Sequence, residues 1–256
     1  MITNIFDSHA HYDDEAFDDD RDELLKSMQE NGVSFIMNVA YDLKSTLAAE
    51  KLSQQYDFIY AAAGVHPENA EGYDENVENE IIRSIKENPK TKALGEIGLD
   101  YHYPEPDREI QIKVFERQLQ IANELDVPVI IHSRDATEDT MTLLRKYKPQ
   151  GILHCYSGSA ETAKEVIKLG MYIGFTGVIT FKNARKAVES AEIVPLDKLL
   201  VETDCPYMAP VPFRGKRCDS TMLQSTVAKL AEIKNVSPQE LSDTTNSNAK
   251  RIFKFF

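Results

Sequence analysis

The sequence has few of the features that mark membrane or secreted proteins. It contains no apolar run of about 18 residues, so we expect no membrane span. The beginning, MITNIFDSHAH, has no basic stretch followed by an apolar one, so no secretory signal is expected. Only three cysteines are present, an odd number without close pairing, which argues against a disulfide framework and fits a reducing compartment. We therefore expect a cytoplasmic location.

Basic residues are also scarce. The chain has 29 Lys and Arg against 42 Asp and Glu, which gives a net charge of −13 with neutral histidines. Extended binding to nucleic acid depends on Lys and Arg neutralising phosphates, so this chain should not bind nucleic acid over a broad surface. Any action on nucleic acid must depend on a local site, where bound divalent cations would reverse the sign of the local field.

The chain shows no linker, no low-complexity tract and no short-period repeat, so we expect a single domain over residues 1–256. The glycine-rich turn of dinucleotide-binding folds is missing after the first apolar run. Eight short apolar segments alternate with helix-length amphipathic ones, which predicts a parallel α/β sheet. Eight such units in 256 residues favour a closed (β/α)₈ TIM barrel, which typically needs about 250 residues. The expected strands are residues 4–8, 33–39, 58–64, 91–97, 127–131, 151–153, 172–175 and 199–202.

An additional helix is predicted at the C-terminal end. Its start signal is Ser237-Pro238 followed by Glu240, a cap with proline in the first helical turn. We expect this helix to pack across the outside of the barrel.

Two histidines lie one residue apart where the first strand is expected to end. In a strand, residues i and i+2 point to the same face, so His9 and His11 can project in parallel. That geometry suits two nitrogen ligands of one metal ion. Taken alone, the pair is equally compatible with one buried and one exposed histidine that have no common role.

Other polar residues fall at the ends of expected strands in the same way. In a (β/α)₈ barrel the active site lies at the C-terminal ends of the strands. One end of the barrel would thus gather His9, His11, Glu96, His132, His154 and Asp204. Each residue alone could be a core histidine, an ion-pair partner or a helix cap, but together they would require six coincidences.

Imidazoles and carboxylates are the ligands of zinc and its neighbours, and carboxylates also bind harder cations. Six such groups exceed the three protein ligands of a typical open zinc site, which favours two divalent ions (Mg, Mn or Zn). The first ion would take His9 and His11 with Asp204 close by, and the second would take His132 and His154. Glu96 would bridge them. Asp204 is the expected general base for a metal-bound hydroxide between the ions.

The order of these motifs resembles the TatD family of metal-dependent hydrolases, within the amidohydrolase-like barrel superfamily. The matching segments run from residue 7 to residue 253: DSHAH, GVHP, GEIGLDY, IIHSRDA, HCYSG, TGVITFKNA, VETDCPY, PFRGKR and TTNSNAKRIF. The resemblance implies a divalent-metal hydrolase with a (β/α)₈ fold, commonly a deoxyribonuclease. It implies the same ligand roles, and it makes His66 a substrate-side residue rather than a ligand.

One segment departs from the family pattern. Family members usually continue RGKR with Asn-Glu-Pro, whereas this chain has Cys218, Asp219 and Ser220. The loop is expected near the metal ligands, so the departure bears on substrate preference and turnover. Cys205 is expected to be a small packed residue beside Asp204, with a nucleophilic role as the alternative.

A small basic group could receive a phosphate. The candidates are Arg214, Lys216 and Arg217 of FRGKR, together with Arg134, two residues after His132. The alternative is a solvated loop with no contact to substrate.

The function expected from these features is that of a metal-dependent deoxyribonuclease that trims DNA ends in the 3′-5′ direction. An alternative is hydrolysis of another ester or amide, such as an aminoacyl-tRNA, because the same centre could attack a carbonyl. A noncatalytic scaffold would have no need of this ligand set. The sequence identifies no protein partner.

Overall fold

The computed structural model describes residues 1–255 and contains eight strands, which form one sheet in sequence order. Strand pairing is parallel, and an isolated bridge between Ala10 and Cys205 joins the end of the first strand to the segment after the last. This is the nearly closed (β/α)₈ barrel that the sequence predicts. The strands are β1 (Ile5–Ala10), β2 (Val33–Val39), β3 (Ile59–Ala63), β4 (Thr91–Asp100), β5 (Val129–Arg134), β6 (Gly151–Leu153), β7 (Tyr172–Phe175) and β8 (Leu199–Val201).

Helices follow the strands along the chain. The α-helices are α1 (Arg21–Ser27), α2 (Leu43–Gln55), α3 (Glu75–Glu87), α4 (Arg108–Leu125), α5 (Thr137–Tyr147), α6 (Ala160–Lys168), α7 (Arg185–Ile193), α8 (Leu223–Lys234) and α9 (Pro238–Ile252). Short 3-10 helices are η1 (Glu15–Phe17), η2 (Gln29–Asn31), η3 (Pro67–Gly72), η4 (Gly177–Thr180), η5 (Leu196–Lys198) and η6 (Ser220–Met222). Among the helices of residues 1–255, none is long and apolar enough to cross a membrane. Residue 256, the last of the predicted domain, lies outside the described residues.

The chain divides into two compact units. The first unit contains residues 1–38, 155–168 and 172–256, and the second contains residues 39–154 and 169–171. Strands β3 to β6 thus belong to the second unit, whereas β1, β7 and β8 belong to the first together with nearly all of β2.

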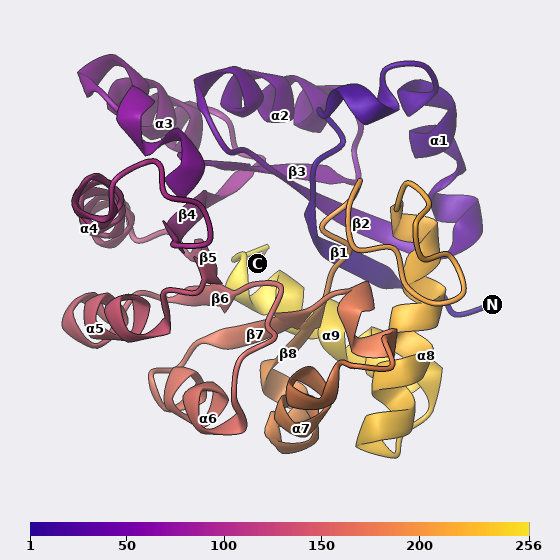
Figure 1. Cartoon of the computed structure of the whole chain (residues 1–256). Helices are drawn as coiled ribbons and strands as arrows, with labels where there is room; N and C mark the ends of the chain where they lie inside the picture. The colour runs from indigo at the N-terminus through magenta and orange to yellow at the C-terminus, as the bar shows by residue number, and fades with distance from the viewer. Residues whose placement is uncertain (256) are drawn as a thin grey trace. The chain divides into compact units, whose positions relative to one another are not determined.

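In the second unit, helices α2 to α5 lie outside strands β3 to β6 (Figure 1). The start of α2 is fixed by a capping box, in which Asp42 accepts from the Ser45 N–H and the Ser45 hydroxyl accepts from the Asp42 N–H. Strands β4 and β5 pair in a register that sets Gly98 opposite His132 and Asp100 opposite Arg134. A side chain at Gly98 would collide with the backbone, because its Cβ would lie 2.0 Å from the His132 carbonyl oxygen. This register brings the polar end of β4 beside that of β5.

In the first unit, the additional C-terminal helix forms as predicted. The Ser237 hydroxyl accepts from the Glu240 N–H at 3.1 Å, and Pro238 begins α9. Its position differs from the prediction, because α9 contacts the N-terminal ends of β1 and β8 rather than an outer face. The Asn246 amide donates to the carbonyl of Asn4, directly before β1, and the Asn248 amide donates to the carbonyl of Leu199 in β8. The helix therefore satisfies backbone acceptors that the strand ends leave unpaired.

Candidate metal centre

In the first unit, three polar side chains meet at the end of β1. His9 is fully buried in β1, and its Nε2 lies 3.0 Å from Nε2 of His11. Oδ1 of Asp204 lies 3.7 Å from the His9 Nε2 and 3.4 Å from the His11 Nε2. The Asp204 N–H donates to the His9 carbonyl at 2.9 Å, which ties the segment after β8 to β1. Two imidazoles and one carboxylate face one another as the ligands of a single cation would.

A buried carboxylate, Asp7, supports these three side chains through hydrogen bonds to the backbone of β1 and of the segment after β8. Asp7 is fully buried and accepts from the Thr203 N–H at 2.9 Å, the Thr203 hydroxyl at 2.7 Å and the Ser220 hydroxyl at 2.6 Å. It also accepts from the His9 N–H at 3.3 Å. Burial raises the pKa of Asp7 to about 6, although these hydrogen bonds lower it. Asp7 therefore connects β1, the end of β8 and η6 in one hydrogen-bonded network.

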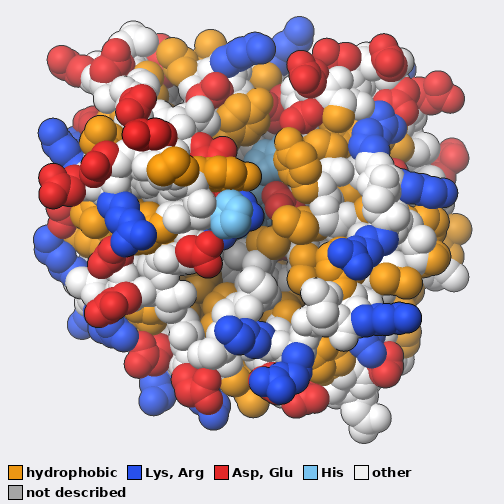
Figure 2. All heavy atoms as spheres, viewed as in Figure 1, with side chains coloured by type: hydrophobic (Ala, Val, Ile, Leu, Met, Phe, Trp, Pro, Cys, Tyr) orange, Lys and Arg blue, Asp and Glu red, His pale blue; other side chains and the backbone are white. Residues whose placement is uncertain are grey.

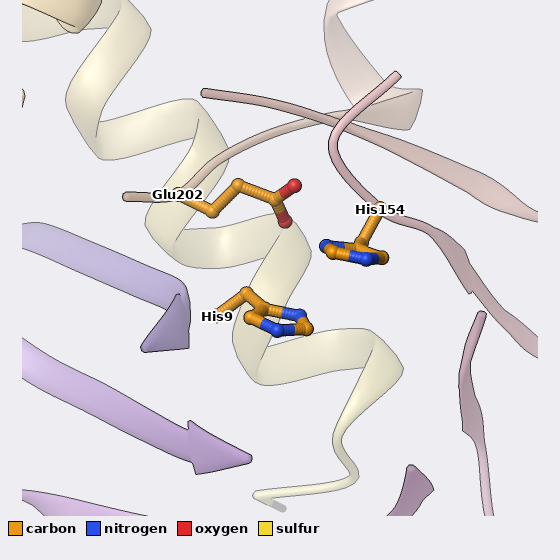
Figure 3. Close-up of side chains that lie close together, drawn as sticks. All are labelled: His9, His154 and Glu202. Atoms are coloured by element: carbon orange, nitrogen blue, oxygen red, sulfur yellow. The ribbon is translucent and has the colours of Figure 1, made fainter. Parts of the chain in front are cut away.

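Glu202 is a second buried carboxylate, and it was not among the site residues predicted from the sequence. It accepts from the Cys155 N–H and, at 3.2 Å, from the Ser8 hydroxyl. Its space depends on Gly174, because a Cβ there would lie 2.2 Å from the Glu202 Oε2. In Figure 3 the Glu202 carboxylate and the His9 imidazole project toward the same space, and the figure also labels His154 of the second unit.

In the second unit, a glutamate lies among three histidines. Oε1 of Glu96 lies 2.6 Å from Nε2 of His154, 3.1 Å from Nδ1 of His132 and 3.8 Å from Nε2 of His66. Glu96 and His154 are buried. The ligand atoms of His66, Glu96 and His132 all lie within 4.8 Å of one another, close enough to hold a metal ion. The ring nitrogens of the imidazoles and the carboxylate oxygen are donor atoms that first-row metals and zinc accept.

His132 is oriented by a carboxylate that the sequence analysis did not select. Its Nε2 lies 2.8 Å from Oδ2 of Asp100, while its Nδ1 faces Glu96. Burial lowers the pKa of His132, but hydrogen bonds and charge interactions with Asp100 and Glu96 outweigh this and raise the pKa to about 10. The cluster thus favours positive charge at this place. A carboxylate on one ring nitrogen is the usual support of a metal-binding histidine.

His66 differs from the other histidines of this cluster. Its Nδ1 accepts from the Glu68 N–H at 3.2 Å, so the ring caps η3. Burial lowers the pKa of His66 to about 3, and the nearby Glu96 carboxylate only partly offsets this. His66 is therefore neutral near pH 7.

The family comparison agrees with this chemistry. Residues 6–254 match the family model described as TatD related DNase. The chain belongs to the TatD family. It is 40% identical over 253 residues to the uncharacterized metal-dependent hydrolase YabD of Bacillus subtilis, with 98% of this chain and 99% of that protein covered. It is 33% identical to the 3′-5′ ssDNA/RNA exonuclease TatD of Citrobacter koseri, covering 97% and 98%. The crystal structure of YJJV, a TatD homologue from Escherichia coli, matches with a TM-score of 0.93 at 29% identity, covering 99% of both chains. The protein is accordingly a metal-dependent hydrolase.

The segment that departs from the TatD family pattern is built into the network around Asp7. Ser220 donates its hydroxyl to Asp7, and its N–H donates to the Tyr12 hydroxyl at 2.8 Å. Proline, which the resemblance to the TatD family leads us to expect at this place, has neither group to donate. Cys218 is buried, and Asp219 caps η6 by accepting from the Thr221 N–H. In this chain Ser220 therefore anchors the segment to Asp7 and Tyr12 by internal hydrogen bonds.

Cys205 is fully buried directly after Asp204. Burial raises the pKa of the Cys205 thiol well above its ordinary value, so the thiol stays protonated near neutral pH. The environment is that of the small packed residue which the sequence analysis expects.

The basic residues proposed for substrate have different surroundings. Arg217 forms a bidentate pair with Asp20, at 2.7 and 2.6 Å, and donates to the Ala16 carbonyl. The Arg214 guanidinium lies 4.3 Å from the centre of the Phe181 ring. Arg134 is exposed at the end of β5, and no ion pair of Lys216 is recorded among the described residues. On the face shown in Figure 2, Lys and Arg side chains are interspersed with Asp and Glu, so this face presents no continuous basic surface.

Proposed function

We propose that this TatD family hydrolase is a nuclease that removes nucleotides from the 3′ end of single-stranded DNA. The observation that carries the proposal is the Glu96 carboxylate among imidazoles, with His154 and His132 at 2.6 and 3.1 Å. The TatD exonuclease of Citrobacter koseri, which acts on ssDNA and RNA in the 3′-5′ direction by its name, supports the choice of substrate.

The proposed centre holds two divalent ions, Mg, Mn or Zn. His9 and His11 would hold the first with Asp204 beside it, His132 and His154 would hold the second, and Glu96 would bridge. The donor sets of the two units fit such ions, since each combines imidazole nitrogens with a carboxylate oxygen. The C-terminal ends of barrel strands are also where enzymes of this fold carry their active sites.

Bound there, divalent ions would lower the pKa of a water molecule and neutralise charge on the phosphate. The protein side chains have separate tasks in this scheme. Asp204, which is 15% exposed where the His9 ring is fully buried, would take the proton from the attacking water. Asp100 would keep the His132 ring in place through the hydrogen bond at Nε2.

Substrate contacts would come from His66 and the exposed bases. We propose that His66, neutral beside Glu96 and with its Nδ1 already accepting from Glu68, donates a hydrogen bond from Nε2 on the substrate side rather than acting as a ligand. Arg134, Arg214 and Lys216 would pair with phosphates near the scissile bond. Arg217 remains part of this proposal, although its guanidinium is already paired with Asp20.

The proposal is tested by offering the metal-loaded protein single-stranded DNA, single-stranded RNA and an aminoacyl-tRNA. The DNA carries a label at its 5′ end, so 3′-5′ trimming gives a descending ladder of labelled products. Release of the amino acid with intact oligonucleotides would instead indicate an aminoacyl-tRNA deacylase.

We also propose a cytoplasmic location and one domain over residues 1–256.

A further inference from the structure

The loop directly after Asp100, at the end of β4, carries an exposed aromatic ring. Tyr103 is 50% exposed, one of few large apolar side chains with such exposure among residues 1–255. It lies three residues after Asp100, the carboxylate that orients His132. Half of this side chain is accessible to solvent, which leaves aromatic surface on which a ligand can stack.

The loop that carries Tyr103 is held at both ends. The Gln111 side chain accepts from the Asp100 N–H at 2.9 Å and donates to the carbonyls of Asp100 and Pro106, at 2.8 and 2.9 Å. The Tyr101 hydroxyl donates to Asp139 at 2.8 Å, and the Tyr101 N–H donates to the Arg134 carbonyl. The backbone on each side of the exposed ring is thus fixed by hydrogen bonds, which lowers the entropy cost of binding.

The side chains of Arg134 and His102 lie against the Tyr103 ring. The Arg134 guanidinium lies over the Tyr103 ring at 5.5 Å from its centre, within the range of a cation–π contact. The His102 ring meets the same ring edge-on, with centroids 4.9 Å apart, and His102 itself pairs with Asp135 at 3.3 Å. An aromatic face next to an exposed guanidinium offers stacking for a base and a charge for its phosphate.

From this arrangement we propose that Tyr103 and Arg134 form a stacking platform for a nucleobase of the single-stranded substrate. The platform rests on the proposed nuclease function and adds a binding site for the base, distinct from phosphate binding at the metal centre. Stacking on an aromatic ring tolerates any base, since each base has a π face. The platform would therefore hold the nucleotide near the scissile phosphate without selecting its sequence.

The test compares two single-stranded DNA substrates that differ only in whether the two 3′-terminal nucleotides carry bases or are abasic. Wild type should show a KM about 5- to 100-fold lower for the base-bearing substrate. Tyr103→Ala should lose most of this difference while its KM for the abasic substrate stays close to wild type. Tyr103→Phe keeps the ring and should keep the difference. Leu47→Ala, an equally exposed apolar side chain on α2, is the matched surface control.

The outcomes separate this inference from the proposed function. If wild type trims DNA and Tyr103→Ala retains the full preference for bases, the platform is wrong and the nuclease proposal stands. If wild type trims neither substrate, the nuclease proposal fails. The platform is then decided by fluorescence anisotropy with the same labelled oligonucleotides: a preference for bases that needs the Tyr103 ring supports it, and equal binding of both oligonucleotides overturns it.

Discussion

Oε1 of Glu96 lies 2.6 Å from Nε2 of His154, closer than it lies to His132 at 3.1 Å or His66 at 3.8 Å. Glu96 and His154 are buried, so the contact between them is shielded from water. A carboxylate this close to several imidazole nitrogens is suited to share a cation with them.

Removal of the central carboxylates should abolish hydrolysis without unfolding the protein. Glu96→Ala and Asp204→Ala should each lower kcat/KM by about a hundredfold or more, because both side chains serve the proposed metal-dependent step. Steady-state kinetics with single-stranded DNA measure the effect, and circular dichroism checks that the variants fold. Wild-type rates for either variant would remove that residue from the proposed centre.

Asp100 should matter through His132 rather than through direct contact with substrate. Asp100→Asn leaves the shape of the side chain but removes the charge that faces the His132 Nε2 at 2.8 Å. Loss of such a supporting carboxylate typically costs about 10- to 100-fold in metal affinity or activity. Titration of the chelator-treated variant with Mn or Zn measures the affinity. Asp139→Asn, which alters the partner of the Tyr101 hydroxyl, is the control and should bind metal as wild type does.

Ser220 should stabilise the fold through Asp7. Ser220→Ala leaves a fully buried carboxylate with one donor fewer, and losing a buried hydrogen-bond partner costs about 1–3 kcal/mol. Urea denaturation measures the free energy of unfolding. Thr221→Ala, whose hydroxyl contacts the partly exposed Asp219, should change that free energy by no more than about 0.5 kcal/mol. Equal stability of Ser220→Ala and wild type would contradict the anchoring role.

Substitutions of Arg217 and Lys216 should have different effects, the first on stability and the second on substrate binding. Because Arg217 is paired with Asp20, Arg217→Ala should lower the free energy of unfolding by about 1 kcal/mol or less. Lys216→Ala should leave stability unchanged and raise KM for an oligonucleotide by severalfold. Steady-state kinetics measure KM for both variants, and urea denaturation measures their free energies of unfolding. A larger rise in KM for Arg217→Ala than for Lys216→Ala would show that Arg217 contributes more to substrate binding than its pairing with Asp20 allows.

The barrel was predictable because its strands are short apolar runs separated by amphipathic helices. The boundaries of these strands were less predictable than their existence. Strand β1 continues to Ala10 and β4 to Asp100, beyond the predicted ends at residues 8 and 97. The predicted ends leave out His9 and Asp100, whereas the barrel admits both within the strands because polar partners surround them.

The predicted ligands that share a unit do lie together, but their supporting carboxylates were missed. Asp7 lies two residues before His9, and Glu202 two residues before Asp204. Asp100 lies four residues after Glu96, again an even spacing. Because alternate residues of a strand share a face, this spacing was the available signal for Asp7 in β1 and Asp100 in β4, whereas Glu202 and Asp204 follow the end of β8. The contacts themselves depend on strand register, such as that of β4 with β5, which sequence periodicity does not fix.

The proposed hydrolysis depends most directly on metal binding by the histidines and carboxylates of both units. Elemental analysis of the purified protein, after equilibration with Mn or Zn and removal of free metal, measures the number of ions per chain. We predict two ions for wild type and one for His154→Ala, with activity lost on chelation and restored by metal. A wild-type protein that retains no ion, or that hydrolyses its substrate equally well in excess chelator, would contradict the account.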